Sequence, residues 1–77
     1  MKTRLRELRK ARGMTQEKIA ELTRVTPRTI ISIEKEQYNP SLMLAYRLAL
    51  ILDTTVEALC CLRENLEEEE KRYAEDA

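Results

Sequence analysis

Between Thr15 and Glu34, apolar residues recur at helical spacing in two short runs that are separated by a polar interruption. They are Ile19, Ala20 and Leu22 in the first run and Ile30 and Ile33 in the second. Thr15 and Thr26 precede these runs as N-cap residues, and Pro27 suits a first helical position, where its missing N–H costs nothing. The pattern predicts two short helices joined by a tight turn.

The second of these helices is expected to present a polar outer face. If Ile30 and Ile33 point toward the core, the side chains turned outward are Arg28, Ile31, Ser32 and Lys35. A short helix, a tight turn and a second helix with such a face are typical of a helix-turn-helix, which presents side chains to a DNA major groove.

Further helices are predicted on both sides of this pair. Residues 2–12 form the first, and Gly13 follows it at a position suited to a left-handed C-cap. Residues 41–52 form a fourth helix that is apolar on more than one side, which is typical of a central or interface helix. Thr55 is placed to cap a short fifth helix.

The C-terminal part of the chain is less regular. Residues 60–62 could continue the fifth helix or end it as a short strand. Residues 66–77 are mostly charged and are expected to form a solvated or frayed tail. The sequence therefore predicts one all-α domain of five helices at residues 1–65 and an acidic tail at residues 66–77.

Composition limits the class of protein. The 77 residues include no Trp, Phe or His, so the core must be thin and aliphatic, and catalytic sites built on histidine are excluded. No apolar run approaches the roughly 20 residues of a membrane span, and the N-terminus lacks a signal-peptide core. We expect a cytoplasmic protein that is not an enzyme and uses no cofactor or metal.

The charge is distributed unevenly although the net charge is zero. Residues 1–38 carry ten Lys and Arg against five acidic residues, a balance of +5. Residues 39–77 carry four against nine, a balance of −5. A basic half suggests a surface for a polyanion, whereas the alternative is a dense charge that only keeps a small helical domain in solution.

Five short motifs together carry a family signal. They are R-x-x-x-G-M-T-Q at Arg9–Gln16, I-A-E-L at Ile19–Leu22, V-T-x-x-T-I at Val25–Ile30, I-E at Ile33–Glu34 and Y-N-P-S-L at Tyr38–Leu42. Over about residues 4–62 the chain resembles the phage repressor and Cro-type helix-turn-helix regulators, and among them the small stand-alone bacterial and archaeal proteins. The resemblance implies a lambda-repressor-like domain of five helices that binds double-stranded operator DNA as a homodimer.

The resemblance also implies roles for individual residues. Arg9 and Glu34 match a buried ion pair that ties the first helix to the third. The positions implied to face DNA are Gln16, Thr26, Pro27, Arg28, Ser32, Lys35, Tyr38 and Asn39. Arg28 would bind guanine in a bidentate manner or, alternatively, contact a phosphate.

Three positions depart from the family pattern. Arg24 stands where the turn usually has glycine, and a left-handed residue with a side chain costs about 1 kcal/mol. Glu36 replaces a frequent glycine after the recognition helix and places an acid near the expected phosphates. Pro27 can offer a base only apolar contact, so base recognition would fall on Arg28 and Ser32.

The second half of the chain holds more apolar residues than a thin monomeric core requires. We therefore predict that the homodimer interface contains Leu44, Ile51, Cys60, Leu62 and Leu66. Cys60 and Cys61 are packing residues in this interpretation, and an intersubunit bridge or a redox sensor is the alternative.

These patterns predict a homodimeric transcriptional repressor. Residues 27–35 of each subunit would enter successive major grooves of a near-palindromic operator, with half-sites about 10–10.5 bp apart. The rival interpretation is a protein-interaction module, either an antitoxin or an adaptor, with a protein partner in place of an operator. Pro27, Glu36 and the acidic tail motivate this alternative.

Overall fold

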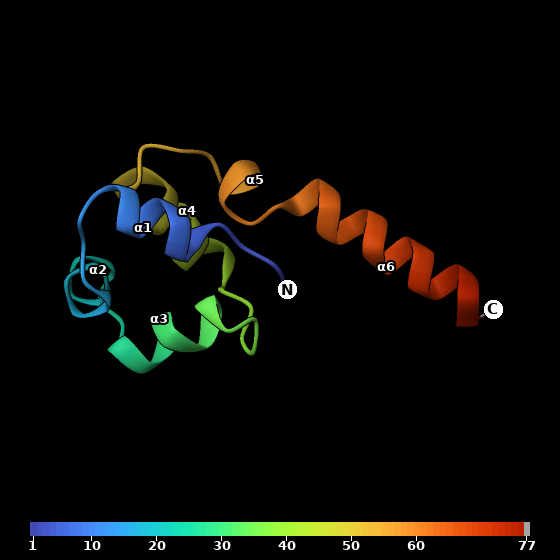
Figure 1. The fold of residues 1–77 in the computed structure, drawn as a ribbon, viewed down its shortest axis with the longest axis horizontal. Coiled ribbons are helices and arrows are strands. Elements are labelled where there is room, and N and C mark those ends of the chain that lie inside the picture. Colours follow the sequence, from blue (N-terminus) through green and yellow to red (C-terminus); the bar gives the residue numbers. More distant parts are fainter. Residues whose placement is uncertain (77) are drawn as a thin grey trace.

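The computed structural model describes residues 1–76, which form six α-helices. The helices are α1 (Leu5–Ala11), α2 (Gln16–Thr23), α3 (Pro27–Glu34), α4 (Leu42–Ile51), α5 (Val56–Leu59) and α6 (Leu62–Asp76). Helices α1 to α5 gather into one body, and α6 extends away from it alone (Figure 1). This helix lengthens the molecule to 43 Å along its longest axis, against 22 and 20 Å along the others.

The predicted all-α fold is confirmed, but the C-terminal part differs from the prediction. No strand occurs between residues 1 and 76. Of residues 60–62, for which a continued helix or a short strand was possible, Cys60 and Cys61 form a turn and Leu62 begins the 15-residue helix α6. The tail expected to be solvated or frayed is helical up to Asp76. Its sequence contains no Gly, Pro or β-branched residue and is rich in Leu, Glu, Arg and Lys, which favour helices. The predicted boundary at residues 65 and 66 falls inside this helix, and Ala77 lies outside the described residues.

The core is aliphatic, as composition requires, and α1 to α5 each contribute to it. The most deeply buried aliphatic side chains are Leu5, Ile19, Ile30, Ile33, Leu48 and Leu59. Burying a side chain of this size typically stabilises a fold by about 1.5–3 kcal/mol. Among the described helices, none is long and apolar enough to cross a membrane.

Side-chain caps define three of the helix starts. Thr15, Ser41 and Thr55 each accept a hydrogen bond from the backbone N–H three residues later, at 3.0–3.2 Å. Thr26 differs from the prediction, because it has the extended N-cap backbone but its hydroxyl contacts the Thr29 hydroxyl at 3.2 Å instead of a backbone N–H. Helix α3 therefore starts on the backbone geometry of Pro27 rather than on a side-chain cap.

Residues with positive φ follow five of the helices, and only one of them is glycine. They are Gly13, Arg24, Glu36, Asp53 and Cys61. At Arg24, φ is 63°, and the N–H groups of Arg24 and Val25 donate to the carbonyls of Glu21 and Ala20, which is the Schellman pattern. The left-handed conformation expected at Arg24 is thus present.

The N-terminal residues are tied down without being helical. Helix α1 begins at Leu5, later than predicted, because residues 2–4 pair with the other end of the domain. The Arg4 N–H donates to the Leu59 carbonyl at 2.8 Å. Asn65 accepts from the Lys2 N–H at 3.1 Å and donates to the carbonyls of Lys2 and Cys60 at 2.8 and 2.7 Å. These contacts of the Asn65 side chain form the Asn65 bridge, which fixes the first turn of α6 to the domain.

Candidate nucleic-acid interface

Helices α2 and α3 form the predicted helix-turn-helix. The left-handed Arg24 ends α2, and the extended backbone of Thr26 leads into α3. At the end of α2, Thr23 is fully buried, and its hydroxyl donates to the Ile19 carbonyl at 2.7 Å. Because Ile30 and Ile33 of α3 are also buried, the two helices share a core and the opposite side of α3 faces outward.

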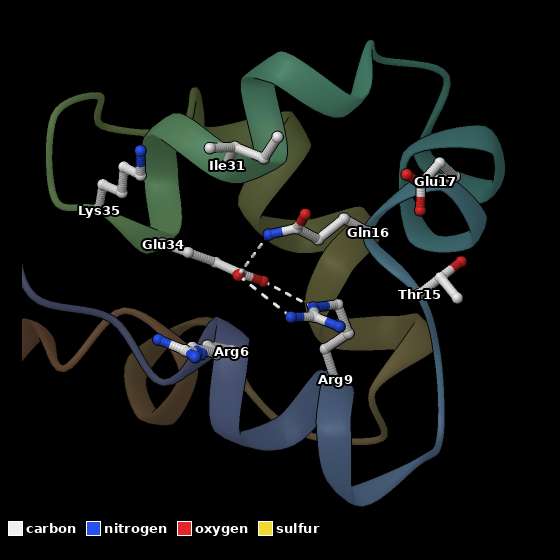
Figure 2. Close-up of a pocket in the computed structure, with 8 residues that line it drawn as sticks. All are labelled: Arg6, Arg9, Thr15, Gln16, Glu17, Ile31, Glu34 and Lys35. Carbon is white, nitrogen blue, oxygen red and sulfur yellow. Dashed lines mark hydrogen bonds and ion pairs between the residues drawn. The ribbon is translucent and has the colours of Figure 1, made fainter.

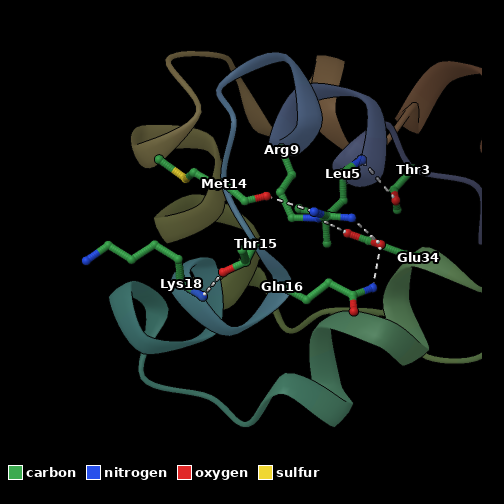
Figure 3. A network of polar contacts seen from close by, with 8 residues as sticks. All are labelled: Thr3, Leu5, Arg9, Met14, Thr15, Gln16, Lys18 and Glu34. Carbon is green, nitrogen blue, oxygen red and sulfur yellow. Dashed lines mark hydrogen bonds and ion pairs between the residues drawn. The ribbon is translucent and has the colours of Figure 1, made fainter.

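Polar side chains connect α1, α2 and α3 at one point (Figure 3). Arg9 donates from Nε and Nη2 to the two carboxylate oxygens of Glu34, at 2.7 and 3.2 Å, and from Nη1 to the Met14 carbonyl at 2.8 Å. Gln16 donates from Nε2 to the same carboxylate at 3.1 Å. Together, Arg9, Gln16, Glu34 and the Met14 carbonyl form the polar cluster.

The polar cluster is shielded from water. The side chains of Arg9 and Glu34 are only 9% and 5% exposed. Within the described residues, no buried side-chain nitrogen or oxygen lacks a hydrogen-bond partner. A buried pair with this geometry fixes the arrangement of its elements more reliably than it adds stability. The cluster therefore sets how the C-terminal end of α3 lies against α1 and the start of α2.

An open hollow of about 500 Å³ lies beside the polar cluster (Figure 2). Its lining residues are Arg6, Arg9, Thr15, Gln16, Glu17, Ile31, Glu34 and Lys35. Arg9 and Glu34 neutralise each other, so the remaining charges are the exposed Arg6 and Lys35 against Glu17. None of the ion pairs found between residues 1 and 76 uses Arg6 or Lys35. The hollow thus offers two free cations to an anion.

This hollow brings together two of the residues implied to face DNA. Gln16 lies at the first position of α2, and Lys35 follows the last residue of α3. The amide nitrogen of Gln16 is held by Glu34, so a phosphate contact by this group would share its donor with the polar cluster.

The other implied residues lie along α3 and the loop after it. Thr26, Pro27 and Arg28 are exposed at the N-terminal end of α3. Ser32 is half-buried one turn later, and its carbonyl accepts from the Gln37 N–H at 2.9 Å. In the loop, Tyr38 and Asn39 are exposed.

Two residues predicted for the dimer interface are instead buried in the core of the single chain. Leu44 and Cys60 are only 5% and 2% exposed and pack in the core of the single chain, so they are not available to a second subunit. Ile51 is half-buried, whereas Leu62 and Leu66 are exposed on α6. The thin core needs more of the apolar residues of α4 and α5 than the sequence pattern suggested.

The sequence interpretation missed two features. The outer face of α4 carries large exposed apolar side chains, namely Leu42, Met43, Tyr46 and Leu50. Their spacing along residues 42–50 is helical, so the signal was present in a helix that is apolar on more than one side. The Asn65 bridge had no such signal, because its partners are backbone groups that lie up to 63 residues away.

Both cysteines are free thiols buried in the domain. Burial raises the pKa of Cys60, and the neighbouring Cys61 raises it further, so this thiol is less nucleophilic than an exposed one. The packing role expected for the pair fits these surroundings.

Comparison with known proteins identifies the family. The model of the helix-turn-helix family matches residues 5–59. An uncharacterised HTH-type transcriptional regulator of Archaeoglobus fulgidus is 48% identical over 59 residues, which cover 77% of this chain and 84% of the relative. Another, of Methanothermobacter thermautotrophicus, is 54% identical over 52 residues, covering 68% and 75%.

Solved structures give the same answer. The restriction-modification controller protein C.AhdI of Aeromonas hydrophila superposes with a TM-score of 0.66 and 38% identity, covering 71% of this chain and 83% of that protein. The clp gene regulator ClgR of Corynebacterium glutamicum gives a TM-score of 0.69 at 23% identity, covering 92% and 79%, and is similar in fold alone. The fold is the lambda-repressor-like one that the motifs implied. The chain therefore belongs to the helix-turn-helix family of DNA-binding transcriptional regulators.

Proposed function

We propose that this protein is a homodimeric repressor that binds a near-palindromic operator through α3. The observation that carries the proposal is the polar cluster, which fixes α3 against α1 and α2 while its outer face stays exposed. A rigid helix with a free face is what a major groove of about 12 Å width admits.

The exposed residues of α3 divide into two roles. Arg28 lies near the N-terminal end, the end that contacts base edges in helix-turn-helix proteins, and its guanidinium can bind guanine O6 and N7. Lys35 lies at the other end beside the hollow and Arg6, where both cations would contact phosphates. Pro27 supplies an apolar contact next to Arg28.

Repression would follow from occupancy of the operator. The similarity to a restriction-modification controller protein, at 38% identity, supports a regulator that acts by binding DNA. The relatives are named as transcriptional regulators, which does not favour an antitoxin or an adaptor.

Selection of bound sequences from random double-stranded DNA tests the proposal. The wild type should enrich a near-palindrome with half-sites about one helical turn apart. Arg28→Ala should relax the preference at one base pair of each half-site, at a cost of about 1–3 kcal/mol per half-site for the preferred sequence. Lys35→Ala should weaken all sequences alike and lower the salt dependence of binding by about one charge per half-site.

Lys71→Ala is the matched control, because it removes the same charge as Lys35→Ala from an exposed position on α6 that lies outside the proposed DNA surface. It should leave the selected sequence unchanged. Enrichment of no sequence by the wild type, together with binding that is insensitive to salt, would contradict an operator-binding function.

A further inference from the structure

Helix α6 carries an apolar stripe that the rest of the described chain leaves exposed. At about 100° per residue, Leu62, Leu66, Glu69 and Tyr73 fall within about 60° of one another around the helix. Leu66 and Tyr73 are 56% and 75% exposed. Beside them, Glu69, Glu70 and Tyr73 line a shallow hollow. One face of α6 therefore combines apolar side chains with two carboxylates.

A second exposed apolar surface, with charged residues of the opposite sign, lies on the outer side of α4. Leu42 and Leu50 are 75% and 62% exposed, with Met43 and Tyr46 on the same face. A hollow of about 320 Å³ at this surface is lined by Leu22, Arg24, Arg47, Leu50 and Ile51. Exposed apolar patches with a polar rim mark interaction sites in small proteins. Here the rim is basic.

The charges at the two surfaces are free to pair with each other. Between residues 1 and 76, the ion pairs of the structure use neither Arg24 and Arg47 nor Glu69 and Glu70. Contact between the two surfaces would bury leucines and tyrosines against one another and place two carboxylates near two guanidinium groups. Such complementarity fixes the register and orientation of an interface.

The two surfaces do not meet within one chain. The Asn65 bridge holds the first turn of α6, and the helix then leads away from α4 (Figure 1). Helices of fewer than about 12–15 residues are marginal in water without tertiary contacts, and α6 has 15. A partner for its exposed stripe would therefore also stabilise the helix.

We infer that α6 of one subunit docks on the outer face of α4 of a second copy, with Glu69 and Glu70 opposite Arg24 and Arg47. The inference rests on the proposed homodimer and specifies its interface. In a twofold dimer the contact occurs twice, which helps to reach the roughly 1,000 Å² that a stable interface buries. The two α6 helices would thus cross from one subunit to the other.

Cross-linking between two variants tests this arrangement. Leu50→Cys places a thiol in the hollow beside α4, and Leu66→Cys places one on the stripe of α6. The full-length variants, one with a mass tag, are mixed and treated with a short bis-maleimide. We expect a covalent dimer that contains one copy of each variant. Wild type is the control, since its own cysteines are buried.

Three other outcomes would overturn the inference. Cross-linking of Leu50→Cys to itself as the main product would show α4 against α4. A double variant with both thiols that cross-links only within one chain would show α6 folded on its own α4. Absence of any mixed product from a dimeric protein would show that the dimer uses another surface.

A substitution on the exposed stripe gives an independent measurement. Leu66→Glu should raise the dimer dissociation constant at least tenfold in sedimentation experiments while leaving the helical content of the monomer unchanged. Lys71→Gln is the matched control, because it also lowers the charge by one but lies on the opposite side of α6. An unchanged constant for Leu66→Glu would overturn the docking alone. If the wild type is monomeric both in solution and when bound to DNA, the proposed homodimer is overturned as well.

Discussion

The polar cluster and the Asn65 bridge join distant parts of the chain in contrasting ways. In the polar cluster, a buried guanidinium and a buried carboxylate meet with charge-assisted bonds of 2.7 and 3.2 Å. In the Asn65 bridge, a neutral, half-buried amide binds backbone groups of Lys2 and Cys60. The first fixes α3 within the core, and the second fixes only the start of α6.

This difference separates the α1–α5 domain, which must hold α3 rigidly, from α6, whose surface remains available to a partner. The matched family region, residues 5–59, contains the polar cluster and ends where the core helices end. Helix α6 lies beyond it with an exposed surface and one anchor. Burial should therefore make the polar cluster the more sensitive of the two to substitution, and α6 the place where partners are chosen.

The largest effect is expected from Arg9→Ala. This change leaves the Glu34 carboxylate buried without its cation, and loss of one partner of a buried pair typically costs about 3–5 kcal/mol. Since small domains are only marginally stable, the variant should be largely unfolded at 37 °C. Urea unfolding followed by circular dichroism measures the loss.

The double variant Arg9→Met, Glu34→Leu separates an unpaired charge from the loss of the pair itself. Replacing both partners by apolar side chains is often neutral or stabilising, so it should recover most of the stability. It should not recover operator binding, because Gln16 then loses the carboxylate that holds it. A double variant that binds DNA normally would show that the polar cluster does not position α3.

A smaller effect is expected from Asn65→Ala. The substitution removes three hydrogen bonds to backbone groups of the N-terminal segment and of Cys60. Because these are neutral bonds and two of them are exposed to water, the loss should be about 1 kcal/mol. The loss should be local. Hydrogen exchange should accelerate in the first turns of α6 while the amides of α3 keep their protection.

Arg63→Ala is the control for this experiment. Arg63 lies in the same turn of α6, but its only ion pair among the described residues is an exposed one with Glu67 at 3.6 Å. It should change neither stability nor exchange measurably. Equal acceleration in α3 and α6 for Asn65→Ala would mean that the two regions unfold together and that the comparison between them fails.

The elements that the sequence predicted well are those set by local rules. Thr15 and Thr55 cap helices as predicted, because their hydroxyls reach a backbone N–H three residues ahead. The pairing of Arg9 with Glu34 came from a motif rather than from any local rule, because 25 residues separate them. Composition or periodicity alone would not have found it.

The errors have physical causes of two kinds. Leu44 and Cys60 were assigned to an interface because apolarity alone does not say which side of a helix a thin core will use. The charge of residues 66–77 predicts a solvated or frayed tail, whereas the run Leu62–Asp76 contains no helix breaker and is helical. Of the residues implied to face DNA, the sequence could place Arg28 on the third helix and Lys35 at its end, but it could not show that Lys35 shares a hollow with Arg6.

The smallest loss of stability is expected at a second ion pair on α1, which tests how far burial decides the strength of an ion pair. Arg4 Nη2 donates to Glu7 Oε2 at 2.6 Å, as short as the bond in the polar cluster, but these side chains are 42% and 65% exposed. Glu7→Gln should shift the urea midpoint at pH 7 far less than Glu34→Gln, because water and salt screen an exposed pair. Equal shifts would mean that bond length rather than burial decides.

The contribution of the Arg4–Glu7 ion pair to stability should depend on pH in a defined direction. The hydrogen bond from Arg4, together with its charge, lowers the pKa of Glu7 below the ordinary value of about 4.3. A carboxylate with a lowered folded-state pKa stabilises the protein above its unfolded-state pKa, and that contribution is lost as pH falls through the lowered one. The small difference between wild type and Glu7→Gln should therefore disappear in acid and also in high salt. A difference that persists in acid would have to come from packing of the Glu7 side chain, since no charge would remain on it.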